Sequence, residues 1–121
     1  MDLVPIHGFV ASAVTIFTLL ITLYAALNYL RKQELSSDFW GAVAIGEGLI
    51  AIQALLGIIL LIEGKFPAQW VHILYGVVTA ATWPVLYTYT RGKQPPAREA
   101  LIWMIVSAIL FGVTLRARAT A

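Results

Sequence analysis

Four long apolar runs constrain the fold of this chain more than any other feature. They cover residues 6–30, 39–62, 68–90 and 100–115. A helix needs roughly 20 mostly apolar residues to cross a bilayer. The fourth run is short, but Arg116 and Arg118 can reach the interface and extend it. Lipid cannot satisfy open backbone groups, and no run alternates like a barrel strand. The sequence therefore predicts an all-α integral membrane four-helix bundle that forms one domain over residues 1–121.

The composition agrees with a membrane protein and removes several kinds of site. Hydrophobic residues make up 60% of the chain and charged residues 12%, whereas a soluble domain carries about 25% charged residues. No cysteine is present, which excludes disulfides, iron–sulfur clusters and covalently attached c-type haem. The net charge is +2, but the basic residues follow the ends of apolar runs, as at lipid headgroups. The predicted partner is the lipid bilayer, and no nucleic-acid binding is expected.

The polar segments between the runs predict the topology. "RKQELSSD", "EGKFP" and "RGKQPPARE" are short, so consecutive helices should be antiparallel neighbours. The first and third segments hold five basic residues, namely Arg31, Lys32, Arg91, Lys93 and Arg98. The opposite side holds three, namely Lys65, Arg116 and Arg118. Because cytoplasmic loops carry the excess of basic residues, both termini are predicted to lie on the extracytoplasmic side.

The chain contains two histidines, and this topology places them at the same level. His7 begins the first span, and His72 lies a few residues into the third. These spans run parallel, so both imidazoles should lie near the outer surface at similar depth. Two neutral imidazoles on helices of a bundle can ligate haem b (protohaem IX) as an axial pair. An interfacial histidine bonded to a carbonyl or a headgroup is the simpler alternative for each, and it stays open.

Small and basic residues near the histidines are the other predicted contacts of a haem. Ala11 and Gly76 each follow a histidine by one helical turn, and Gly57 lies at similar depth on the second span. Small residues there would leave room for a macrocycle, although they also serve ordinary helix packing. Lys65 and Arg116 are on the same predicted side, where haem propionates need cations.

Two further polar residues lie inside the second span. Gln53 could reach the edge of a haem, although hydrogen bonding within the bundle explains it more simply. Glu47 is a carboxyl group inside a span, which is costly and makes it a candidate for proton uptake or a quinone site. A hydrogen-bonded structural carboxyl is the alternative. No catalytic residue is assigned.

Several of these segments together resemble one half of the heme A synthase family. They are His7, "LRKQ", "QALLG" from Gln53 to Gly57, and "FPAQWVHILYG", which contains His72. The resemblance covers the first three spans. It implies that His7 and His72 ligate a haem on the extracytoplasmic side of a bacterial or archaeal cytoplasmic membrane.

The departures from that family limit what the resemblance implies. The catalytic half of the family has a glutamate three residues before its first histidine, and Val4 stands at that position. Cysteines of an outer loop are absent, one half is present, and the fourth helix follows the ligand helices instead of preceding them. The resemblance thus implies a haem-holding protein and gives no support for oxidation of a haem methyl group.

The predicted function is that of a membrane-bound b-type cytochrome that passes single electrons, with a quinone or an extracytoplasmic protein as redox partner. Because no catalytic residue is assigned, the sequence favours an electron-transfer or haem-binding protein over a self-contained enzyme. The alternative is a non-catalytic small subunit of a larger respiratory or photosynthetic complex, or a homodimer. Copper binding by the histidine pair is disfavoured because the chain has two methionines and no cysteine to act as soft ligands. A transporter is disfavoured because apart from Glu47 little could bind a substrate.

Overall fold

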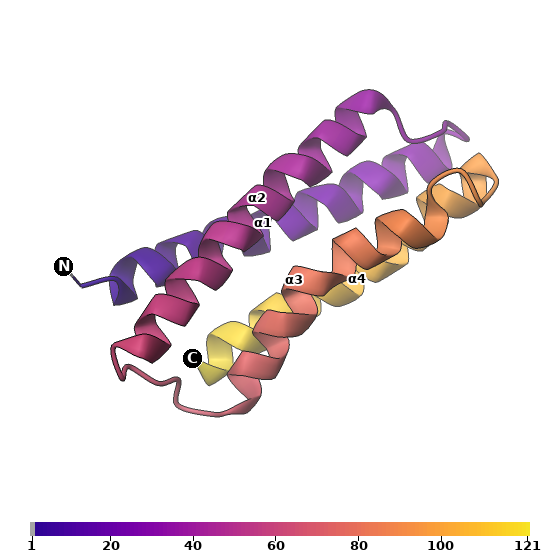
Figure 1. Cartoon of the computed structure of the whole chain (residues 1–121). Helices are drawn as coiled ribbons and strands as arrows, with labels where there is room; N and C mark the ends of the chain where they lie inside the picture. The colour runs from indigo at the N-terminus through magenta and orange to yellow at the C-terminus, as the bar shows by residue number, and fades with distance from the viewer. Residues whose placement is uncertain (1) are drawn as a thin grey trace.

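The computed structural model describes residues 2–121, which form four helices joined by short loops (Figure 1). The helices are α1 (Val4–Leu30), α2 (Ser37–Ile62), α3 (Val71–Thr90) and α4 (Pro96–Thr120). Each of them is long and apolar enough to cross a membrane. The prediction of an all-helical chain with four candidate spans is confirmed, and a lipid bilayer is the environment that such helices require.

Local signals in the sequence explain where the helices begin and end. Pro96 occupies the first turn of α4, where a missing amide hydrogen costs nothing. The Ser36 hydroxyl accepts a hydrogen bond from the Phe39 amide at 3.4 Å and caps α2. After α2, Gly64 adopts a φ of +80°, a left-handed conformation that favours glycine. These signals keep the connections short and the neighbouring helices antiparallel.

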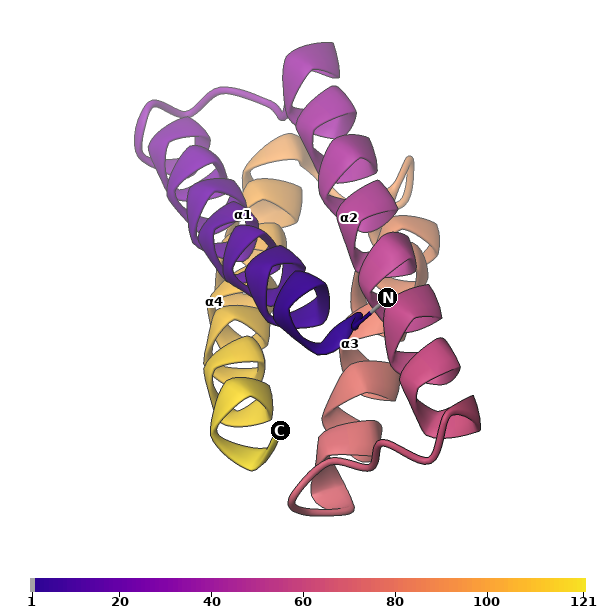
Figure 2. The ribbon, with the colours of Figure 1, turned by 90° about the vertical axis from the view of Figure 1, so that its left-hand side faces the viewer.

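The helices pack in the cyclic order α1, α2, α3, α4, each against two neighbours. Figure 2 shows this order, with α1 beside α4 and α2 beside α3. The α1–α4 pair packs most closely and the α2–α3 pair least closely. Both termini and the α2–α3 loop lie at one end, here called the terminal end (Figure 1). The other end, which carries the α1–α2 and α3–α4 loops, is called the aromatic end.

One stripe of residues on each helix, spaced three or four apart, faces the bundle axis. On α1 the buried members are Val14, Thr18, Ile21, Ala25 and Asn28, and on α2 they are Phe39, Val43, Gly46, Ile50 and Leu60. On α3 they are Thr79, Trp83, Leu86 and Thr90, and on α4 they are Ala100, Trp103, Ser107, Leu110 and Thr114. This spacing is the heptad pattern of left-handed helix packing. Continued by the same steps, the stripes include His7, Gln53, Gly57, His72 and Gly76.

Large aromatic side chains form the core at the aromatic end. Trp83 and Trp103 are 1% and 0% exposed. The Trp83 Nε1 donates to the Ser107 hydroxyl at 3.2 Å, and the Trp103 Nε1 donates to the Thr90 hydroxyl at 2.9 Å. Phe39 contacts Trp103 edge to face, with ring centres 5.7 Å apart. Both hydrogen bonds join α3 to α4, so this cluster fixes the second hairpin.

The helix bounds differ from the apolar runs in the second half of the chain. The third run was expected to begin at residue 68, but α3 begins at Val71 because residues up to Trp70 form a loop and turn. The fourth run was expected to cover 16 positions, and α4 has 25 residues. The segments "PAREA" and "RARAT" extend it, since alanine, arginine and glutamate favour helix. Arg116 and Arg118 therefore belong to α4 itself.

Candidate functional site

His7 and His72 meet at the terminal end of the bundle. They come from α1 and α3, which lie diagonally in the cyclic order of the helices. Both are partly buried, and their ring centres are 6.2 Å apart with an angle of 74° between the ring planes. The two imidazoles therefore face each other across the bundle axis, at the common level that the antiparallel topology predicts.

His72 is held by the last turn of α4. Its Nδ1 lies 2.7 Å from the carbonyl oxygen of Ala117. A carbonyl can only accept, so this contact places the proton on Nδ1 and leaves the lone pair on Nε2. The Ala117 carbonyl is one of the last four of α4, which lack helical amide donors, and it also accepts from the Thr120 hydroxyl at 3.1 Å. His72 thus has a structural role as a cap of α4, and its other nitrogen is oriented by the same bond.

His7 has no such support. Its Nδ1 is buried and has no hydrogen-bond partner in residues 2–121. Its Cε1 would lie 3.5 Å from a Cβ added to Gly57, so the glycine of α2 borders the ring directly. A buried polar nitrogen without a partner is destabilising, by roughly 1–3 kcal/mol. Packing alone therefore does not explain why a histidine occupies this position.

The arrangement suits two imidazoles bound to opposite sides of one metal. With metal–nitrogen distances of about 2 Å, the ring centres of such a pair would be about 6 Å apart. The separation of 6.2 Å agrees with that value. The oriented Nδ1 of His72 is the usual outer contact of a metal-bound histidine. The same separation is common for edge-to-face rings, so the donor set fits haem but the distance alone is not specific.

No third ligand adds to the pair. Among the residues that the structure describes, no group of three or more histidine, cysteine, aspartate or glutamate side chains could hold a metal ion. The chemistry available at this point is that of two imidazole nitrogens. That donor set is the one found in bis-histidine haem proteins.

The small residues predicted around the haem lie on the inward stripes of their helices. Ala11, Gln53 and Gly57 are partly buried, and Gly57 is the one next to His7. Gly76 is exposed, and a Cβ there would meet nothing within 4 Å. The stripe of α3 is therefore covered at Thr79 but open at Gly76, one turn nearer the terminal end.

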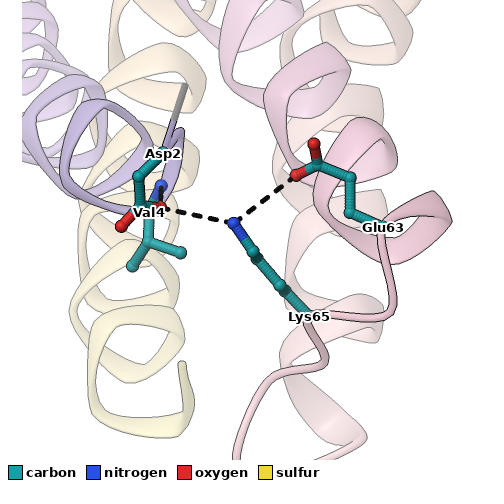
Figure 3. Close-up of polar contacts among 4 residues, drawn as sticks. All are labelled: Asp2, Val4, Glu63 and Lys65. Carbon is teal, nitrogen blue, oxygen red and sulfur yellow. Dashed lines mark hydrogen bonds and ion pairs between the residues drawn. The ribbon is translucent and has the colours of Figure 1, made fainter.

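Lys65 and Arg116, the two basic residues predicted to pair with haem propionates, have different surroundings. The Lys65 Nζ lies 3.5 Å from the Asp2 carboxylate and 3.7 Å from the Glu63 carboxylate (Figure 3). The pKa of Asp2 is below its ordinary value, chiefly because the Val4 amide donates to the carboxylate, with Lys65 nearby. Lys65 thus already has two carboxylate neighbours. Arg116 is exposed near the end of α4.

The terminal end also contains a contact that links α1 to α4. The Arg118 guanidinium donates to the Ser12 hydroxyl at 2.8 Å. The Thr120 carbonyl accepts from the Gln69 amide at 3.1 Å. Together with the bond from His72, these contacts fix the last turn of α4 against α1 and the start of α3.

Glu47 lies on the part of α2 nearer the aromatic end, away from the histidine pair. It is partly buried, and its Oε2 has no partner in the described part of the chain. The Gln53 Oε1 is likewise buried without a partner. Hydrogen bonding within the bundle, the simpler explanation of both residues, therefore leaves one oxygen of each unexplained.

Comparison with known proteins identified no protein similar to this chain. No family model matches the chain, and neither does a curated protein or a solved structure. The resemblance to one half of the heme A synthase family therefore stays a prediction that depends on His7, His72 and the Gln53–Gly57 motif.

The Ala117 carbonyl is the contact that the sequence did not indicate. A backbone oxygen has no signature among residue types, so only the packing of α4 against α3 could place it. The one available signal was that α4 ends near the start of α3 in an antiparallel bundle, where unsatisfied carbonyls need donors.

Proposed function

We propose that this chain is a membrane-bound b-type cytochrome that holds haem b between His7 and His72. The observation that carries the proposal is the pair of facing imidazoles, whose ring centres are 6.2 Å apart. The hydrogen bond from His72 to Ala117 supports it, because it leaves the Nε2 lone pair of that ring free to bind a metal. When bound, haem supplies one-electron chemistry between ferric and ferrous iron.

The residues of the chain would orient and shield the cofactor. The Ala117 carbonyl holds His72 as the tautomer whose Nε2 carries a lone pair. Gly57 and Ala11 present little side-chain volume beside His7. The surrounding helices are apolar, which lowers the dielectric constant near the imidazoles and influences the potential of the group that they bind. With both imidazoles as its ligands, the group would supply electron transfer instead of oxygen chemistry.

The proposal places both termini and the histidine pair on the extracytoplasmic side of a bacterial or archaeal membrane. Support comes from the basic residues at the other end, which include Arg31, Lys32 and Arg91. A relation to the haem-holding half of heme A synthase would fit this orientation. Val4, in place of the catalytic glutamate of that family, is exposed at the start of α1. The proposed role is accordingly haem binding and electron transfer.

An absorption spectrum of the protein extracted from membranes of haem-replete cells tests the proposal. The reduced protein should show a sharp α-band, and either His7→Ala or His72→Ala should abolish it. Asn28→Ala is the matched control, because Asn28 is a buried polar residue on the same stripe of α1 at the far end. A colourless wild-type preparation would contradict the proposal, as would retention of the band in both histidine variants.

The second candidate is a small subunit that packs in a larger respiratory or photosynthetic complex. The specific observation in its favour is on α2, where Gly41 and Gly48 are exposed and a Cβ at either position would meet nothing within 4 Å. Small exposed residues allow another helix to approach closely in a membrane. Gly48→Leu should release the chain from such an assembly on native gels, whereas His7→Ala should not. The two functions are compatible if the haem lies within the complex.

A further inference from the structure

A groove lies between α2 and α3, the neighbouring helices that pack least closely. Its volume is about 490 Å³, within the range of about 300–1,000 Å³ for sites of small organic molecules. Its lining consists of Trp40, Val43, Ala44, Glu47, Trp83, Pro84, Tyr87 and Thr88. The groove belongs to the half of the bundle nearer the aromatic end, so it is separate from the histidine pair.

Glu47 is the acidic residue of this groove. Its Oε2 is buried and has no hydrogen-bond partner among the described residues. A carboxyl group in apolar surroundings is costly unless it is hydrogen-bonded. In its neutral form it can donate one hydrogen bond and accept others. A ligand that presents a carbonyl or hydroxyl oxygen to Glu47 would supply the missing partner.

The walls of the groove suit a flat ring. Trp40, Trp83 and Tyr87 contribute aromatic faces or edges, which pack well against another conjugated ring. Pro84 lies inside α3 and has no amide hydrogen, so the Ala80 carbonyl loses its usual helical donor. This carbonyl is a second polar group, one turn from the groove, that an ordinary helix would not offer.

A second cavity, beside the loops of the aromatic end, adjoins the groove. The two cavities share Trp40 and Tyr87. The second one is lined by polar residues that include Glu34, Gln94 and Glu99. An acyl chain of a lipid would need neither a carboxyl group nor this polar vestibule. A ligand whose ring oxygens gain and lose protons would use both, and this favours a redox-active ring over a lipid tail.

We propose that the groove binds the ring of a membrane quinone or hydroquinone, with a ring oxygen hydrogen-bonded to Glu47. The redox role of such a ligand rests on the proposed cytochrome function, whereas its binding depends only on the groove. Ten residues separate Glu47 from Gly57, the neighbour of His7, which corresponds to about 15 Å along α2. The quinone would thus bind in the same chain as the haem, toward the opposite side of the membrane.

Quenching of tryptophan fluorescence by decylubiquinone in detergent micelles tests the proposal, because Trp40 and Trp83 line the groove. Wild-type protein should show saturable quenching. Glu47→Leu should weaken binding about tenfold through the lost hydrogen bond, and Glu47→Gln should stay within about threefold of wild type. Ala44→Leu should abolish saturation by filling the groove. Ala51→Leu is the matched control, because Ala51 is exposed on α2 and outside the groove.

Two results would overturn the proposal. One is quenching that never saturates and is equal in wild type and Ala44→Leu. This comparison does not depend on Glu47→Leu, so it remains valid if that variant fails to fold. The other is displacement of the quinone by dodecanol at equal concentration, which would assign the groove to a lipid chain. The assay needs no haem. If a colourless protein binds quinone, only the proposed cytochrome function is contradicted. If the protein shows a haem spectrum but binds no quinone, only the proposed quinone site in the groove is contradicted.

Discussion

The two ends of the bundle fill the same inward stripes with different kinds of side chain. At the aromatic end the stripes carry Phe39, Trp83 and Trp103, all of which are fully buried. At the terminal end the stripes include two histidines and two glycines, which are partly buried or exposed, namely His7, Gly57, His72 and Gly76. The heptad spacing is the same at both ends, so the geometry of helix packing does not require the small and polar residues. The aromatic end is joined by large buried rings, and the terminal end by hydrogen bonds to the last turn of α4.

Hydrogen bonding differs in the same way. Trp83 and Trp103 donate to hydroxyl groups of the opposing helix. At the terminal end His72 has a carbonyl partner, but His7 leaves a buried nitrogen unpaired. A stability role explains the tryptophans and half of the histidine pair. Neither packing nor hydrogen bonding explains His7, so the two histidines should respond differently to substitution.

The largest effect should come from Trp103→Ala at the aromatic end. Trp103 is 0% exposed, and its loss leaves a cavity and removes the donor to Thr90. We expect a loss of about 3–5 kcal/mol in the free energy of unfolding, measured by reversible unfolding in mixed micelles. Trp70→Ala, at an exposed residue of the terminal end, should change it by less than about 0.5 kcal/mol. Equal losses for the two variants would remove the contrast between the ends.

A smaller effect should follow from adding one methyl group to a glycine at each end. A Cβ at Gly46 would lie 2.7 Å from a carbon of Trp83 and 2.8 Å from a carbon of Phe17. Gly46→Ala should therefore destabilise the bundle by about 1–3 kcal/mol. Gly57→Ala should be tolerated, because its Cβ would meet one atom, at 3.5 Å. Melting temperatures of the two purified variants compare them, and a larger loss for Gly57→Ala would contradict the comparison.

Within the terminal end, the two histidines should respond differently to leucine. In the haem-free protein His7→Leu should leave the free energy of unfolding unchanged or raise it by up to about 1 kcal/mol, since it removes an unpaired buried nitrogen. His72→Leu should lower it by roughly 1 kcal/mol, since the hydrogen bond to the Ala117 carbonyl is lost while the Thr120 hydroxyl still donates to that carbonyl at 3.1 Å. Chemical unfolding of both variants measures the difference. Equal destabilisation would mean that His7 also has a structural role.

The smallest effect concerns the ion pairs at the terminal end. Lys65→Met should raise the pKa of Asp2 toward its ordinary value of 3.8, while the Val4 amide still keeps it lower. The lowered pKa in the folded state means that the Asp2 carboxylate contributes stability at neutral pH. That contribution is lost as the pH falls through the lowered pKa. A carboxyl-carbon NMR titration of Asp2 gives both values, and an unchanged pKa would show that Lys65 has no influence.

The apolar runs allowed the number of helices and their antiparallel order to be predicted, because lipid permits few other folds. The common level of His7 and His72 followed from that order. The length of α4 could not be predicted from the apolar run. Residues with high helix propensity, such as Arg116, continue the helix beyond the last apolar residue of that run. The groove beside Glu47 depends on how loosely α2 and α3 pack, and no pattern in either helix specifies the closeness of a neighbour.

His72→Asn tests the central claim most directly, because it separates the two nitrogens of one ring. Asparagine can keep a donor near the Nδ1 position toward the Ala117 carbonyl, but it has no counterpart of Nε2. Haemin should be titrated into purified wild-type and variant protein, with melting temperature and absorption followed together. We predict a bis-histidine haem spectrum for wild type, and a variant that melts within a few degrees of wild type but does not give this spectrum. An unchanged haem spectrum in His72→Asn would contradict ligation by His72.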